Sequence, residues 1–215
     1  MIQILPAILA TTEEEYKEAV SKINSSDELS GGMVHVDVAD GIYVNSKTFW
    51  GDFSKYPLQL EKEAHLMVSE PTSFVTRLSL YKFKRVLFHL GVGKEDHIIE
   101  IIKQRHLEVG LVLNPEMWLD QLKPYLEKID VVLLMGVHPG KQGQDFIPET
   151  LDKIKDCARL RKDNALSFKI GVDGGVSPDN IKSIMETGAD YAVVGSRLLN
   201  GDINENLESF WEAIL

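Results

Sequence analysis

Four side chains that can bind metal ions or carry protons lie at or near the ends of short apolar runs: His35, Asp37, His65 and Asp173. His35 and Asp37 are two residues apart, and on a β-strand such side chains point to the same face. Two imidazoles and two carboxylates form a suitable ligand set for a divalent ion. A lone histidine or aspartate at a strand end is more often a turn or cap residue. The metal interpretation therefore depends on whether the fold brings all four together.

The apolar pattern predicts alternating strands and helices. Strands are expected at Gln3–Leu9, Met33–Val38, Ala64–Val68, Arg85–His89, Glu108–Leu113, Val131–Met135, Ser167–Val172 and Tyr191–Val194. Helices are expected at Glu13–Ile23, Pro71–Tyr81, Lys94–Gln104, Glu116–Glu127, Pro148–Leu160, Pro178–Thr187 and Asn204–Ile214, whereas Trp50–Leu60 has no clear pattern. Alternating strands and helices imply a parallel sheet, and eight such units fit a closed barrel better than an open sheet.

The expected fold class is therefore α/β, a single (β/α)8 TIM barrel in which outer helices surround an eight-stranded parallel barrel. No Pro/Gly/Ser-rich linker divides the chain, so residues 1–215 are expected to form one domain. Active sites of such barrels lie at the C-terminal ends of the strands. In this fold the two histidines and two aspartates would all face one mouth.

Composition restricts the partners. The 215 residues are 44% hydrophobic and 26% charged, with a formal net charge of −10. This charge argues against nucleic acid or an anionic membrane as a partner, and it means that an anionic substrate needs a local site.

The sequence has no signal-peptide pattern and no run of membrane-spanning length, which predicts a cytoplasmic protein. We also expect the chain to form a homo-oligomer.

Two glycine-containing turns suggest a phosphate site. Gly174 and Gly175 follow the seventh expected strand, and Gly195 and Ser196 follow the eighth. Barrels of this type often bind phosphate with these two loops, because bare backbone N–H groups can approach an anion. The alternative is that the glycines only make tight strand-to-helix turns. The occurrence of both pairs beside a metal-type cluster favours phosphate.

The loop after the sixth expected strand, residues 136–144, is long and polar and could act as a lid over the site. It contains Gly140 and Gly143. His138 in the same loop is expected to be an ordinary loop residue, because no carboxylate lies two residues away.

Several motifs together resemble the ribulose-phosphate 3-epimerase family, in the family's order and spacing and over nearly the whole chain. They are Pro6-Ala7-Ile8-Leu9, His35-Val36-Asp37-Val38-Ala39-Asp40-Gly41, His65-Leu66-Met67-Val68, Val112-Leu113-Asn114-Pro115, Leu134-Met135-Gly136-Val137-His138-Pro139-Gly140, Val172-Asp173-Gly174-Gly175-Val176 and Val194-Gly195-Ser196. The resemblance implies a (β/α)8 barrel that inverts C3 of a ketose phosphate, such as ribulose 5-phosphate.

The resemblance also implies roles for individual residues. One divalent ion would bind to His35, Asp37, His65 and Asp173, with the two aspartates as the acid/base pair. Phosphate would contact Gly143, Gly174, Gly175, Gly195 and Ser196, with Gly140 in the same loop as Gly143. Inversion next to a carbonyl needs a base on one face and an acid on the other, and a metal would stabilise the cis-enediolate between the two steps.

Two methionines, Met67 and Met135, would lie near the reacting carbon and limit the access of water. The alternative, ordinary barrel core, is equally compatible with their positions. The metal is left open among Zn, Fe, Mn and Co, because two histidines and two carboxylates suit all four.

The chain departs from the family pattern in its substrate pocket. Ala7 stands where a substrate-contacting serine is usual, and Ala39 where methionine is usual. The strand-6 loop reads Gly140-Lys141-Gln142-Gly143-Gln144 in place of Gly-Phe-Gly-Gly-Gln, His138 replaces an asparagine, and Gly91 replaces a glutamate. The metal and acid/base residues are intact, so these departures concern the identity of the sugar more than the chemistry.

Three other functions are compatible with this pattern. Extra room at Ala39 would suit another ketose phosphate, such as allulose 6-phosphate. Related phosphosugar decarboxylases and aldolases use an Asp-x-Lys-x-x-Asp set, and the strand-2 motif here has no lysine. A non-catalytic sugar-phosphate-binding barrel is the alternative of a different class, since fold alone does not determine function.

Overall fold

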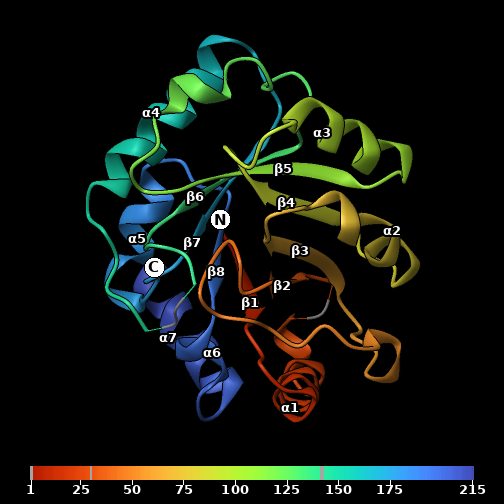
Figure 1. Cartoon of the computed structure of the whole chain (residues 1–215). Helices are drawn as coiled ribbons and strands as arrows, with labels where there is room; N and C mark the ends of the chain where they lie inside the picture. Colours follow the sequence, from red (N-terminus) through yellow and green to blue (C-terminus); the bar gives the residue numbers. More distant parts are fainter. Residues whose placement is uncertain (1, 30, 141–142) are drawn as a thin grey trace.

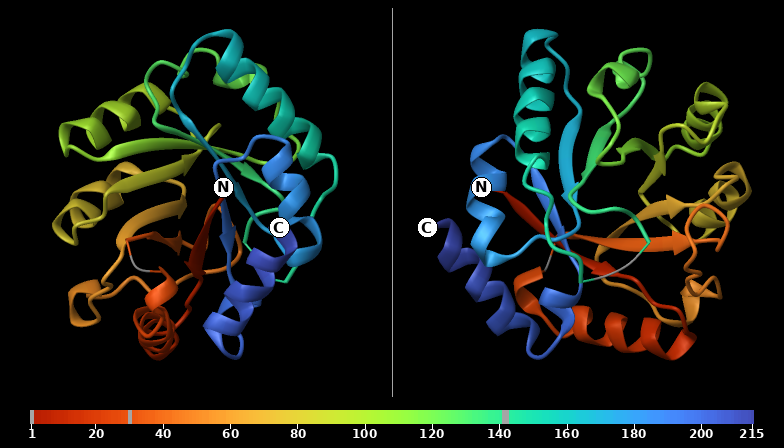
Figure 2. Two further views of the ribbon diagram at one scale, coloured as in Figure 1. Left: turned by 180° about the vertical axis from the view of Figure 1, so that it is seen from behind. Right: turned by 60° about the vertical axis from the view of Figure 1, so that its left-hand side comes forward.

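Eight strands close into a barrel in the order of the sequence, and each strand is parallel to both neighbours. The computed structural model describes residues 2–29, 31–140 and 143–215. Helices lie around the outside of the strands (Figure 1), and views from behind and from the side show the same arrangement (Figure 2). The predicted fold class, a (β/α)8 barrel, is confirmed. No helix in the described ranges is both long and apolar enough to cross a bilayer.

The element bounds follow the apolar pattern closely. The strands are β1 (Gln3–Ile8), β2 (Met33–Ala39), β3 (Glu61–Met67), β4 (Arg85–His89), β5 (Glu108–Leu113), β6 (Val131–Met135), β7 (Lys169–Asp173) and β8 (Tyr191–Val194). The α-helices are α1 (Glu13–Asn24), α2 (Thr72–Leu80), α3 (Glu95–Gln104), α4 (Thr150–Asp163), α5 (Pro178–Glu186), α6 (Ser196–Leu199) and α7 (Ile203–Ile214). Short 3-10 helices are η1 (Asp27–Leu29), η2 (Phe53–Lys55) and η3 (Leu119–Leu122).

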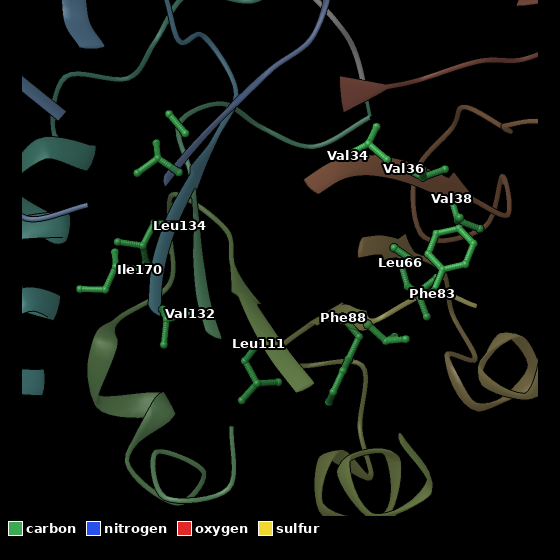
Figure 3. Packing of buried hydrophobic residues seen from close by; sticks show 14 of the residues in the cluster. Val34, Val36, Val38, Leu66, Phe83, Phe88, Leu111, Val132, Leu134 and Ile170 are labelled. Atoms are coloured by element: carbon green, nitrogen blue, oxygen red, sulfur yellow. The ribbon is translucent and has the colours of Figure 1, made fainter. Parts of the chain in front are cut away.

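Strand alternation separates two apolar layers. Val34, Val36 and Val38 of β2 point outward, as do Phe88 of β4 and Leu134 of β6, and they pack beneath the helices (Figure 3). The barrel interior has its own cluster, made of Leu5, Ala7, Met33, Leu87, Val112, Val131, Leu133, Met135, Val137, Tyr191 and Val193. The residues between the outward valines of β2 therefore face the barrel interior, which places His35 and Asp37 inside.

The helix predicted over Glu116–Glu127 is wrong. The described chain there forms only the four-residue η3 and a series of turns. Pro124 lies in the middle of the predicted helix, where proline removes a backbone donor and clashes with the preceding turn. Trp118, an apolar residue of the predicted helix, is 78% exposed in the structure.

Three smaller differences concern element boundaries. Helix α6, which begins directly at Ser196 after β8, was not predicted. The segment Trp50–Leu60, which had no clear pattern, contains η2. Strand β3 begins at Glu61, three residues before the predicted start, because its charged first residues pair with β2 and β4.

Asp40 joins the loops that follow β2 and β3 at the mouth of the barrel. Its Oδ1 accepts hydrogen bonds from the backbone N–H groups of Ile42 and Tyr43 at 2.8 and 2.9 Å. Its Oδ2 accepts from the Ser69 N–H at 2.7 Å and the Ser69 hydroxyl at 2.8 Å. Burial opposes ionisation, but these four bonds lower the pKa of Asp40 to about 2. The carboxylate thus holds two site-forming loops together.

We predict that Asp40→Asn lowers the free energy of unfolding by about 1–3 kcal/mol at neutral pH, because the amide replaces one acceptor oxygen by a donor. A carboxyl with a lowered folded-state pKa stabilises above its unfolded-state pKa, so the deficit should shrink as pH falls from about 4 to about 2. Urea unfolding at several pH values measures this effect. Asp120→Asn, in a side chain that is 81% exposed, is the control and should change little. An Asp40 deficit that does not depend on pH would contradict this role.

Candidate active site

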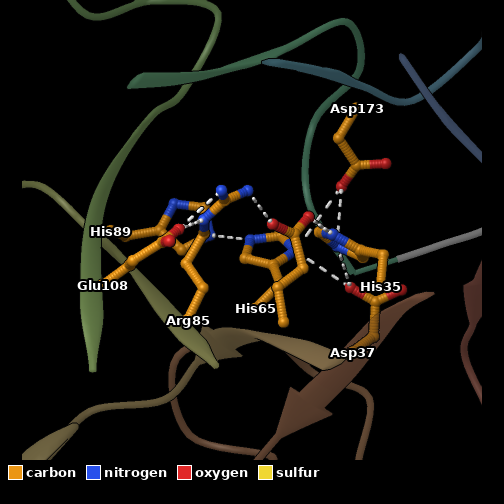
Figure 4. A network of polar contacts seen from close by, with 8 residues as sticks. His35, Asp37, His65, Arg85, His89, Glu108 and Asp173 are labelled. Carbon is orange, nitrogen blue, oxygen red and sulfur yellow. Dashed lines mark hydrogen bonds and ion pairs between the residues drawn. The ribbon is translucent and has the colours of Figure 1, made fainter. Parts of the chain in front are cut away.

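The barrel register brings the four predicted metal ligands together. On the β2–β3 pair, Asp37 lies directly opposite His65, and Asp173 ends β7. His35 Nε2 lies 3.3 Å from Asp37 Oδ1 and 3.7 Å from Asp173 Oδ2. His65 Nδ1 lies 2.9 Å from the same Asp37 oxygen and 3.4 Å from the same Asp173 oxygen. Figure 4 shows the two carboxylates on either side of the two imidazole rings.

These residues have the properties of a metal centre. One potential ligand atom from each residue lies within 4.8 Å of the others. The histidine side chains are 0% and 1% exposed and the aspartates 11% and 15%, so the cluster opens to solvent only on the carboxylate side. His35 Nε2 is buried and has no hydrogen-bond partner among the described residues. A buried nitrogen without a partner, facing two carboxylate oxygens, fits a divalent cation of the type bound by nitrogen and oxygen ligands.

The surroundings shift the pKa values of the two aspartates in opposite directions. Burial opposes the charge on Asp37, but the nearby imidazole of His35 and the hydrogen bond from His65 keep its pKa below the usual value. For Asp173, burial dominates and raises the pKa. Burial also opposes the charge on His35, but the nearby carboxylate of Asp37 and the hydrogen bond to Glu63 raise its pKa well above the usual value. Two carboxyl groups with divergent pKa values form an arrangement suited to acid/base chemistry.

Two buried residues that contact the cluster were not predicted as site residues. Glu63 Oε1 lies 2.7 Å from His35 Nδ1, and His89 Nε2 lies 2.9 Å from His65 Nε2. Burial, followed by the proximity of His65, lowers the pKa of His89 well below the usual value, so its ring is neutral. Glu63 and His89 each lie at inward-facing positions of apolar strands. For His89 the signal available in the sequence was a polar residue at the end of the apolar run Arg85–His89, whereas Glu63 lies one residue before the predicted strand Ala64–Val68 and gave no such signal.

A cavity of about 300 Å³ opens over the cluster at the C-terminal ends of the strands. It is lined by Asp37, His65 and Asp173 and by all eight residues predicted to contact substrate or phosphate, namely Met67, Met135, Gly140, Gly143, Gly174, Gly175, Gly195 and Ser196. His35 does not line the cavity and lies beneath it. The predicted site residues are therefore adjacent in space, although their contacts with a substrate remain predictions.

Packing alone explains why two of the lining positions are glycine. A Cβ at Gly174 would lie 2.3 Å from Val137 Cγ2, and one at Gly175 would lie 2.6 Å from the backbone of Phe146. Both glycines also have positive φ angles, at 102° and 69°. Contacts with the segment after β6 and the positive φ angles therefore require glycine at both positions, whether or not an anion binds there.

The departures from the family pattern occupy different places. Ala7 lines the cavity, whereas Ala39 is buried, 4% exposed, and does not line it. His138 is exposed on the strand-6 loop, in agreement with its prediction as a loop residue. Lys141 and Gln142 lie outside the described residues. Arg197, which the sequence analysis did not single out, also lines the cavity next to Ser196.

Comparison with known proteins identifies the family. The model of the ribulose-phosphate 3 epimerase family matches residues 3–199. The chain belongs to this family. It is 34% identical over 200 residues to a ribulose-phosphate 3-epimerase of Serratia marcescens, covering 91% of this chain and 94% of the relative. It is 33% identical over 202 residues to the Escherichia coli enzyme of the same name, covering 92% and 88%. These matches confirm the expectation that the chain is an enzyme of the carbohydrate epimerase class.

A solved structure supports the fold alone. Crystalline KGPDC of Streptococcus mutans superposes with a TM-score of 0.70 at 13% identity, covering 100% of this chain and 97% of the other. At this identity the similarity concerns the barrel and carries no information about the reaction.

We predict that binding of a divalent ion releases protons, since His35 carries a proton at neutral pH in the metal-free cluster and a metal ligand must be deprotonated. Affinity should therefore rise with pH. Calorimetric titrations with Zn²⁺ in buffers of different ionisation enthalpy should give heats that depend on the buffer. His35→Ala should lose most of the bound metal. Heats that are identical in all buffers would contradict the protonated state, and full metal content in His35→Ala would contradict the ligand assignment.

Proposed function

We propose that this chain inverts C3 of a ketose phosphate, interconverting ribulose 5-phosphate and xylulose 5-phosphate. The observation that carries the proposal is the placement of Asp37 and Asp173. They come from different strands, β2 and β7, and meet on either side of the two histidines at the base of one cavity. Two carboxyl groups that reach one carbon from two sides can remove a proton on one face and return a proton on the other.

In the metal-free chain, the pKa values of the two aspartates shift in the directions that support this division of roles. Asp37 has a lowered pKa and is ionised, so it can accept the C3 proton. Asp173 has a raised pKa and is the better proton holder. After one turnover the two roles are exchanged, which is what a reversible epimerisation needs. Met67 and Met135, both 3% exposed, would cover the reacting carbon and limit exchange of the transferred proton with water.

His35, Asp37, His65 and Asp173 would hold one divalent ion. Such an ion, when bound, stabilises negative charge on the oxygens of an enediolate. His35 and His65 would act as neutral ligands held in place by the barrel strands. Zn, Fe, Mn and Co all suit this set of nitrogen and oxygen donors.

The glycine-containing part of the cavity lining is suited to the phosphate. Gly174, Gly175, Gly195 and Ser196 would offer backbone N–H groups to the anion, with Gly143 and Gly140 from the strand-6 loop. Arg197 adds a cation that has no acidic partner among the described residues. In a chain of net charge −10, these local donors would provide the attraction for a dianion.

Two alternatives remain in the proposal. A 3-epimerase for another ketose phosphate, such as allulose 6-phosphate, is favoured by Ala7, whose small side chain leaves room in the cavity. A non-catalytic sugar-phosphate-binding barrel would retain binding without turnover. Assays with a panel of ketose phosphates distinguish all three. The cytoplasmic location and the homo-oligomeric state stay predictions from the sequence.

We predict that Asp37→Asn and Asp173→Asn each abolish epimerisation while the barrel still folds, because each removes the proton carrier on one face. General acid–base groups typically contribute about 10²–10⁴-fold, so turnover above about a tenth of wild type would contradict the role of that aspartate. Thermal unfolding and metal content of each variant separate loss of chemistry from loss of structure. Asp156→Asn on the outer helix α4 is the control and should keep full activity.

We also predict that the phosphate is needed for productive binding, since binding energy from a remote group can be used to position the reacting carbon. Free ketopentoses should be poor substrates in both kcat and KM. Gly195→Val should block the anion and leave the metal content unchanged. Steady-state kinetics with ribulose and ribulose 5-phosphate test this. Equal kcat/KM for the two sugars would refute the phosphate site.

A further inference from the structure

A chain of buried charges runs across the barrel interior from the metal cluster to the rim. His35 Nδ1 lies 2.7 Å from Glu63 Oε1, and Glu63 Oε2 accepts a hydrogen bond from the Arg85 guanidinium at 2.8 Å. Arg85 in turn donates to Glu108 Oε2 at 2.7 and 2.8 Å. The four residues face one another in register on β2, β3, β4 and β5. Figure 4 labels three of them, His35, Arg85 and Glu108.

This arrangement determines which nitrogen of His35 carries the hydrogen. Arg85 has donors only, so Glu63 is paired with it as a carboxylate and acts as an acceptor at both oxygens. His35 Nδ1 must then be the donor. In the neutral ring this leaves the lone pair on Nε2, the atom that faces Asp37 and Asp173 and that has no hydrogen-bond partner among the described residues.

We infer that Glu63 and Arg85 are positioning residues for the metal centre, with Glu63 setting the tautomer and ring orientation of His35 and Arg85 holding Glu63 in place. This inference rests on the proposed function, in which His35 is a metal ligand. Hydrogen-bond partners of metal-bound histidines generally act in this way. Neither residue touches the cavity, so their effect on the reaction passes entirely through His35.

The alternative is that Glu63 and Arg85 only stabilise the barrel and do not affect the metal site. The side chains of His35 and Glu63 are 0% exposed and that of Arg85 5%, and the Arg85 guanidinium also lies over the ring of Tyr191, 5.8 Å from its centroid. A pair of this kind could serve only to neutralise charge in the barrel. In that case its removal would change the stability of the barrel and leave the binding of metal unaffected.

Metal binding to the full chain distinguishes the two roles. Metal-free protein is titrated with Co²⁺ against a chelator, and the visible absorption of the bound ion reports its ligand geometry. Glu63→Gln should weaken Co²⁺ binding about 10- to 100-fold and alter the spectrum, because the amide can present a donor to Nδ1 and favour the wrong tautomer. Glu108→Gln makes the same chemical change at the far end of the chain of charges, where the side chain is 34% exposed. This matched control should leave affinity and spectrum unchanged.

A second variant covers the case in which Glu63→Gln fails to fold. Glu63→Leu combined with Arg85→Met removes both buried charges together, which proteins tolerate better than removal of one partner, and it leaves His35 Nδ1 without an acceptor. It should fold and should bind Co²⁺ as weakly as Glu63→Gln alone. Co²⁺ affinity within about twofold of wild type and an unchanged spectrum, in either folded variant, would overturn the inference, since partners of this kind typically contribute about 10-fold or more. Absence of Co²⁺ binding by the wild-type protein would overturn the proposed metal centre itself, and this inference with it.

Discussion

Two carboxylates, Asp37 and Asp173, and two imidazoles, His35 and His65, share a site that is almost closed to water. The charges in this site determine which polar residues lie beside it in the barrel interior. Buried charges are tolerated only where they are paired and hydrogen-bonded. Each imidazole accordingly contacts an aspartate on one side and a buried partner on the other, Glu63 for His35 and His89 for His65. The parallel register of β2, β3 and β4 makes these contacts possible, because it sets the inward-facing residues side by side.

The barrel separates the proposed chemistry from substrate recognition. The proton carriers and metal ligands lie on strands, whose positions are determined by two apolar layers and by the closed hydrogen-bonded sheet. The residues proposed to bind phosphate follow the strands β6, β7 and β8, and one of the loops that hold them, the strand-6 loop, also departs from the family pattern. A rigid centre with variable loops is the general design of this fold. The alternative of another ketose phosphate therefore concerns Ala7 and the strand-6 loop, while the acid/base pair is retained.

Much of this arrangement could be predicted from the sequence, because apolar alternation determines strands and the two-residue spacing of His35 and Asp37 determines a shared face. The rest depended on tertiary contacts. Glu63 lies one residue before the predicted strand Ala64–Val68 and Arg85 begins another, and only the closed barrel shows that they face each other in the interior. The predicted helix after β5 failed for a local reason, Pro124, which a stricter reading of the sequence would have detected.

The most direct test of the proposed reaction follows the C3 proton. The protein, loaded in turn with Zn²⁺, Fe²⁺, Mn²⁺ or Co²⁺, is incubated with ribulose 5-phosphate and other ketose phosphates in deuterated water, and products are analysed by NMR. The proposal predicts that deuterium appears at C3 of at least one ketose phosphate together with its C3 epimer. It also predicts that the other carbons stay unlabelled. Absence of exchange at C3 with every metal and every ketose phosphate, or labelling at C1 instead, would contradict it.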